Sequence, residues 1–167
     1  MSAPPGSILN ALDPAPVASR QVIGHFIPSA IFAALSGAMP DRLMAPGADP
    51  IWLSVWRGQN PSFTLTVFQV GGTGARPAKD GLSAVGFPSG VAGVPAEVIE
   101  SLSPVVMKRR ELRPDSGGPG VWRGGLGQLT EFTRRGAGRW SVSSIADRTV
   151  YAAPGLHAGG ADYSTAV

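Results

Sequence analysis

The sequence has no cysteine among its 167 residues, and it has only two histidines, His25 and His157. The absence of thiols excludes disulfides, thiolate metal sites and cysteine nucleophiles, and it is typical of a cytoplasmic protein. Neither histidine has a second metal-ligating side chain at a suitable spacing. We therefore expect no cofactor and no metal ion to be bound by this chain itself.

The sequence also has few charges and no long hydrophobic run. Charged residues make up 15% and hydrophobic residues 43%, a composition that argues against disorder. The most apolar segment, residues 22–39, is interrupted by His25, Pro28 and two serines, and it is shorter than the roughly 20 residues that span a bilayer. No secretory signal is visible. We expect no membrane association and interpret this segment as a buried helix.

The basic excess is modest, with a net charge of +3. Much of it lies in two runs, Lys108–Arg110 with Arg113 and Arg134–Arg135 with Arg139. Acidic and apolar residues alternate with these runs, and no zinc-finger spacing or aromatic RNA-binding pattern accompanies them. The pattern favours a solvated face or a subunit contact over nucleic acid as the partner. A mean hydropathy of +0.11 is high for a free domain and indicates apolar surface that packs against other polypeptide.

Glycine and proline, in contrast, are abundant, with 23 and 16 residues respectively. They are concentrated in Glu111–Gln128, which cannot be a helix because each glycine costs about 1 kcal/mol and each proline about 3 kcal/mol in a helix interior. Asp115, Ser116, Trp122 and Arg123 lie between these glycines. Two interpretations remain open: a structural loop in which the acid accepts backbone hydrogen bonds and pairs with the arginine, or a functional site.

The remaining chain predicts an α+β fold that is antiparallel and β-rich, with one longer N-terminal helix, one short helix and long Gly/Pro-rich loops. We expect one domain over residues 1–167, made of an extended arm (1–16) and an α+β body (17–167). The first helix is predicted to begin between residues 17 and 20 and to end near 36–37, with Pro28 bending it or setting a new start. Its apolar face is expected to include Val22, Phe26 and Ala30.

Alternating β-branched and aromatic residues predict strands that pair in antiparallel fashion. The predicted strands are 51–56, 62–68, 105–112, 126–133 and 140–145, with Val150–Tyr151 extending the last. Residues 95–102 predict the short helix. Within these elements we interpret His25 as a satisfied core or interface histidine rather than a ligand. Likewise, a capping or surface role for Glu100 is favoured over a general base.

The loop between residues 71 and 90 follows a predicted strand and displays Arg76, Lys79 and Asp80 at a sheet end. A phosphate-binding loop requires GxxxxGK[ST], or GxGxxG leading into a helix, and neither occurs here. Nucleotide binding by this chain is therefore not expected.

The segment Arg113–Gly127 resembles the signature of the hydantoinase B/oxoprolinase family. Three further segments agree: Gly71–Gly81 is similar to the family's second Gly-rich loop, Pro95–Glu100 with Ser103–Pro104 to its short acidic element, and Pro154–Gly160 to its terminal turn. The resemblance extends from about residue 5 to residue 160, and it corresponds to the C-terminal third of the family's proteins. At Gly93 the sequence departs from the family, which usually has an asparagine there.

The resemblance implies the C-terminal portion of an ATP-dependent hydrolase of small cyclic amides, such as 5-oxoproline or a hydantoin. In that family an A-type subunit handles ATP, and the N-terminal part of the B-type subunit carries the metal ligands. We therefore expect the A-type subunit and the remaining B-type segment as partners, with ATP and a divalent metal in the complete enzyme and no activity in this chain alone. The alternative is a non-catalytic structural or interaction subunit, or an inactive remnant of the family.

The same resemblance directs attention to particular side chains. Asp115 and Arg123 are the candidate catalytic residues. Arg76, Asp80 and Ser116 are candidates for contacting substrate or for ordering the loops.

Overall fold

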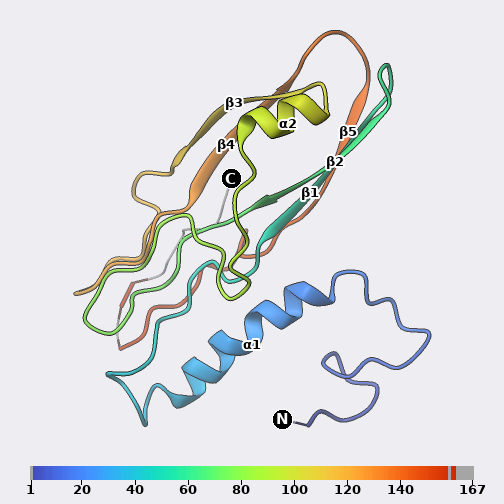
Figure 1. Cartoon of the computed structure of the whole chain (residues 1–167). Helices are drawn as coiled ribbons and strands as arrows, with labels where there is room; N and C mark the ends of the chain where they lie inside the picture. Colours follow the sequence, from blue (N-terminus) through green and yellow to red (C-terminus); the bar gives the residue numbers. More distant parts are fainter. Residues whose placement is uncertain (1, 158, 161–167) are drawn as a thin grey trace.

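The computed structural model of the chain describes residues 2–157, 159 and 160. Two antiparallel sheets form its body, as predicted. The first has the order β2-β1-β5 and consists of β1 (Trp52–Gly58), β2 (Phe63–Gln69) and β5 (Trp140–Ile145). The second pairs β3 (Val105–Leu112) with β4 (Gln128–Arg134). The two helices are α1 (Arg20–Leu35) and α2 (Ala96–Leu102) (Figure 1). The α+β prediction is therefore confirmed.

A cluster of aromatic side chains joins the two sheets. The ring of Trp56 on β1 lies 4.9 Å from that of Phe132 on β4 and 5.1 Å from that of Trp140 on β5, measured between centroids. Leu65 and Val67 on β2 are buried in the same cluster. Because strand side chains alternate between faces, the threonines on either side of Leu65 point away from this core.

Helix α2 closes one end of this core. Ile99 of α2 and Val105 of β3 are the most fully buried large side chains in the described chain. The carboxylate of Glu100 accepts a hydrogen bond from the main-chain nitrogen of Met107 at 3.2 Å and pairs with Arg135 at 3.3 Å. Glu100 therefore ties α2 to β3 and to the residue that follows β4, which supports a structural role over that of a general base.

Helix α1 differs from its prediction in two respects. It continues without interruption through Pro28, so no new helix starts there. Its buried residues are the polar His25 and Ser29, whereas Val22 and Phe26 are half-buried and Ala30 is exposed. The expected apolar face was therefore wrong. Figure 1 shows the reason: α1 lies beneath the loops at one end of the sheets rather than inside the core.

Two smaller expectations are also resolved. Residues 150–151 form a bend and do not extend β5, which ends at Ile145. In the N-terminal arm, a single bridge joins Ser7 to Asn10. No helix in the described part of the chain is long and apolar enough to cross a membrane.

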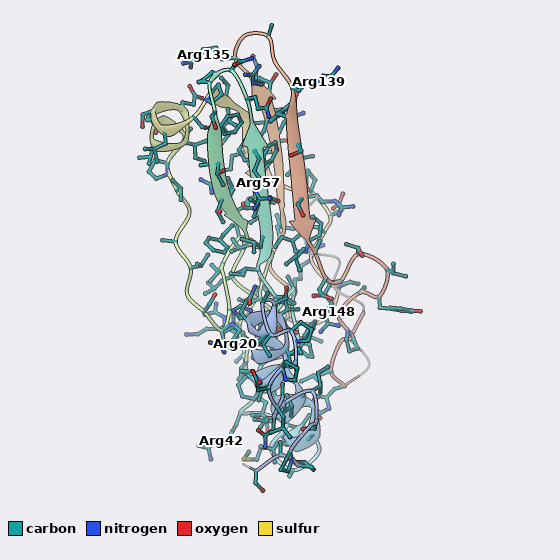
Figure 2. All side chains as sticks on the ribbon, turned by 90° about the vertical axis from the view of Figure 1, so that its right-hand side faces the viewer. Arg20, Arg42, Arg57, Arg135, Arg139 and Arg148 are labelled. Carbon is teal, nitrogen blue, oxygen red and sulfur yellow. The ribbon has the colours of Figure 1, made fainter. Side chains whose placement is uncertain are left out.

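The arginines of the two basic runs mostly serve local contacts. Arg134 donates to the carbonyls of Gln59 and Asn60, and Arg110 donates to the carbonyl of Val94. Figure 2 shows Arg135 and Arg139 at one end of the molecule, Arg42 near the other end, and Arg57, Arg148 and Arg20 between them. The labelled basic groups are therefore spread along this side and do not form one patch.

Candidate functional site

Four extended segments from distant parts of the chain lie side by side at the end of the sheets opposite α2 (Figure 1). They comprise residues 45–48, 71–75, 81–85 and 123–127. Main-chain hydrogen bonds join them into what we call the loop stack: Ala45 donates to Ala75, Thr73 to Leu82, and Gly125 to Thr73, at 2.8–2.9 Å. The two Gly-rich motifs recognised in the sequence are therefore direct neighbours.

Glycine is required in the loop stack because the main chains approach too closely for a side chain. A Cβ atom at Gly72 would collide with the main chain of Gly125. One at Gly125 would collide with Leu82, and one at Gly117 would collide with Gly124. These contacts are with backbone, which cannot rotate away as a flexible side chain could. The signature glycines consequently determine how closely the segments pack.

Asp80, Arg76 and Arg123 meet where the two Gly-rich motifs adjoin. The carboxylate of Asp80 accepts a hydrogen bond from the main-chain nitrogen of Arg123 at 2.7 Å, and the Arg123 carbonyl accepts one from Gly81 at 2.7 Å. Arg76 donates through Nε to the Asp80 carbonyl at 2.9 Å. Asp80 thus holds the signature loop against its neighbour, while the guanidinium of Arg123 makes no hydrogen bond or ion pair within the described residues.

Ser116 and Asp115 are adjacent in sequence but have different surroundings. Ser116 is buried, and its hydroxyl donates to the Arg113 carbonyl at 2.8 Å and accepts from the Gly127 nitrogen at 2.9 Å. It therefore closes the base of the signature loop. Asp115 is exposed, has a positive φ of 54°, and pairs with no other group in the part of the chain described. The structure does not bring Asp115 and Arg123 together as an ion pair.

A pocket of about 510 Å³ lies beside the loop stack. Its walls come from residues 40, 41, 43, 45 and 46, from 74–78, from 118–122 and 124, and from 154–157, 159 and 160. It therefore joins the family signature, the second Gly-rich loop and the terminal turn. Most of the lining is glycine, proline and apolar side chain; the ionisable side chains on it are Asp41, Arg76 and His157. This size is ordinary for a ligand site.

A second polar cluster, which the sequence did not indicate, fixes α1 to the body. Asp49 accepts a hydrogen bond from the Ser29 hydroxyl at 2.6 Å and pairs with the Arg148 guanidinium at 2.8 Å. The Asp49 side chain is 1% exposed and that of Arg148 16%. Arg148 also lies over the ring of Phe26, 5.0 Å from its centroid. Because Asp49 is 20 residues from Ser29 and 99 from Arg148, no local pattern reveals this cluster.

His25 lies close to the same cluster. It is buried as expected, but its Nδ1 atom has no hydrogen-bond partner, so the histidine is not fully satisfied. Burial lowers the pKa of His25 below its ordinary value of 6.5, and the negative charge of Asp49 opposes part of this effect. Among the described residues no three acidic or histidine side chains are grouped so that they could hold a metal ion.

Comparison with known proteins gives consistent matches. A family model described as hydantoinase B/oxoprolinase matches residues 1–166. The candidate B-type subunit of a D-/L-hydantoinase from Pseudomonas sp. (strain NS671) is 32% identical over 145 residues, which cover 85% of this chain and 24% of that protein. The beta subunit of a caprolactamase from Pseudomonas jessenii is 32% identical over 140 residues, which cover 77% of this chain and 24% of that protein.

Two further matches agree with these. The 5-oxoprolinase PfmaA of Pestalotiopsis fici (strain W106-1 / CGMCC3.15140) is 34% identical over 118 residues, covering 70% of this chain and 9% of that protein. A nucleotide-free structure of acetone carboxylase, from work on ATP-dependent acetone carboxylation, is 26% identical with a TM-score of 0.57, and it covers 71% of this chain and 17% of that one. The chain thus spans about a quarter or less of the length of these proteins.

Proposed function

The chain belongs to the hydantoinase B/oxoprolinase family, and we propose that it forms the C-terminal portion of an ATP-dependent hydrolase of small cyclic amides. It acts there with an A-type subunit that handles ATP and with the remaining B-type segment, which carries the metal-bearing site. The observation that supports this most strongly is the family match over residues 1–166, together with the meeting of three signature segments around one pocket. The names of the hydantoinase, caprolactamase and oxoprolinase relatives agree with an amide substrate.

The chemistry of the proposal follows from the substrate. A resonance-stabilised amide is a poor electrophile, and transfer of a phosphoryl group from ATP to its oxygen makes the carbon more reactive toward water. The described side chains offer no donor set for a metal ion, so no step that needs one is assigned to this chain. Its contribution is a rigid set of loops whose geometry Asp80 and Ser116 maintain by hydrogen bonds.

Among the candidate site residues, Asp115 and Arg123 differ from Asp80 and Ser116. The carboxylate of Asp115 and the guanidinium of Arg123 have no partner inside the described chain. We propose that these two groups reach the rest of the assembled enzyme, and that Arg76, on the pocket wall, lies close to its substrate.

Reconstitution tests the proposal. This chain, the A-type subunit and the remaining B-type segment are purified separately and mixed, and phosphate release from ATP is measured with 5-oxoproline, a hydantoin and caprolactam in turn. We expect substrate-stimulated release and ring-opened product only when all three polypeptides and a divalent metal are present. Turnover by this chain alone would contradict the proposal, and full activity of the other two polypeptides without it would instead favour a non-catalytic subunit or an inactive remnant.

A further inference from the structure

The tip of the signature loop, Val121–Trp122–Arg123, is held firmly while its side chains remain outside. Gly124 donates a main-chain hydrogen bond to Gly118 at 2.9 Å, and Asp80 and Gly81 bond both main-chain polar atoms of Arg123. Gly117 and Gly125, which lie on either side of the tip in the sequence, are packed against other backbone. The tip is therefore a fixed platform and not a loose loop.

The platform presents apolar surface that nothing in the described chain covers. Val121 is 94% exposed and Trp122 is 48% exposed. Large apolar side chains are normally covered in a finished structure when they occur together, and a rimmed apolar patch marks an interaction surface. Tryptophan and arginine are also the residues enriched where binding energy concentrates in protein interfaces.

The surroundings of the platform indicate what it binds. The Val121 and Trp122 side chains border the pocket of about 510 Å³, whose wall carries the half-buried Arg76. Arg76 uses Nε to bond a carbonyl, and Arg123 uses only its main chain, so both guanidinium groups keep terminal nitrogens for other acceptors. The acid next to them, Asp80, already accepts from Arg123. A complementary surface would combine apolar side chains with a carboxylate.

Exposure also indicates the size of the ligand. A small molecule inside the pocket would contact Trp122 and one side of Val121, but Val121 is 94% exposed, and the rest of its side chain would stay uncovered. Covering both requires a larger partner. We propose that residues 121–123 and the adjoining pocket form a docking surface for an apolar, carboxylate-bearing segment of the remaining B-type polypeptide. This inference rests on the proposed function.

The choice of that polypeptide follows from the relatives. In each of them the region similar to this chain is joined to a longer polypeptide, because it covers only 24%, 24% and 9% of their lengths. The rest of the same B-type protein is therefore the polypeptide that is most readily available to pack against the signature loop. An A-type subunit or a second copy of this chain are the other partners that the experiment distinguishes.

The test measures binding of the purified chain to the remaining B-type segment by biolayer interferometry. The variants are Trp122→Ala, Val121→Ser/Trp122→Ala and Arg123→Glu. Matched controls are Leu102→Ala, an apolar residue 71% exposed on α2, and Arg139→Glu. Figure 2 places Arg139 at the end of the molecule opposite Arg42, which adjoins the pocket-lining Asp41.

We expect each single variant to weaken binding about tenfold, and the double variant more, as for central interface residues. The controls should stay within about twofold of the parent. Urea midpoints should change little, because Val121 and Trp122 are exposed and the Arg123 guanidinium has no partner in the described chain. Unchanged binding in all three variants would overturn the inference, as would their selective loss of binding to the A-type subunit or of self-association. If the variants lose binding but the parent assembly hydrolyses no cyclic amide, the proposed function fails while the docking surface stands.

Discussion

The buried carboxylate of Asp49 provides the sharpest test of how α1 is held. In Asp49→Asn the shape is retained, and asparagine tolerates the positive φ of 53° at this position nearly as well as aspartate. The charge is lost, however, and the new amide nitrogen is a donor facing either the Ser29 hydroxyl or the Arg148 guanidinium. Removing one member of a buried pair leaves the other charge uncompensated, which costs about 3–5 kcal/mol.

Urea denaturation followed by circular dichroism measures this cost. Ser29→Ala removes only the hydrogen bond to the carboxylate. It should lower the free energy of unfolding by about 1.5–3 kcal/mol, less than Asp49→Asn does. The double variant Asp49→Asn/Arg148→Asn lacks both charges. Its decrease in the free energy of unfolding should therefore be smaller, by about 0.5–3 kcal/mol, than the sum of the decreases for Asp49→Asn and Arg148→Asn alone. Asp41→Asn, on an exposed acid, is the matched control. If Asp49→Asn destabilises no more than this control, or if the two single losses add fully, the cluster does not fix α1 as argued.

Three other changes test separate parts of the structure. Burial lowers the pKa of His25, so just below pH 6.5 the unfolded chain binds more protons than the folded chain, and the free energy of unfolding should fall as the pH decreases from 6.5. His25→Leu should remove this dependence and flatten the plot of urea midpoint against pH; an unaltered plot would contradict the assignment. Gly125→Ala should cost at least about 1–3 kcal/mol by overpacking, whereas Gly24→Ala, in open space on α1, should stabilise by about 0.5–1 kcal/mol; similar midpoints for both would refute the loop-stack sterics. Asp115→Asn should lower the activity of the reconstituted enzyme without moving the urea midpoint, and equal activity would remove Asp115 from the site.

The sequence was sufficient for the strands but not for their partners. Alternation in the segments around Leu65 and Val55 predicts β2 and β1 and, through the short connection between them, their antiparallel pairing. The other neighbour of β1 is β5, where Ser144 lies opposite Ser54 across 90 residues of chain. Such a pairing depends on the shared core around Trp56 and has no local signature.

Helix α1 and the site show the same limit. Periodicity predicted the length of α1 well, but it assigned the wrong face, because the buried Ser29 bonds to Asp49, a polar residue from outside the helix, whose charge also acts on the buried His25. For the signature loop, the residue types predicted turns and candidate groups. They did not distinguish Ser116, which closes the loop internally, from Asp115, which points outward, although the two are adjacent.

The loop stack also explains why its irregular segments have a defined alignment without regular strands. At several contacts both sides are glycine, as where Gly72 approaches Gly125 and Gly117 approaches Gly124. A shift of the signature loop by one residue in one direction would place Leu126, instead of Gly125, against Gly72, where its side chain would meet backbone. Regular sheets set their register through which side chains are buried. In the loop stack, the glycine positions set the register instead. The side chains at the tip, residues 121–123, are therefore not needed for the alignment and can bind partners outside the described chain.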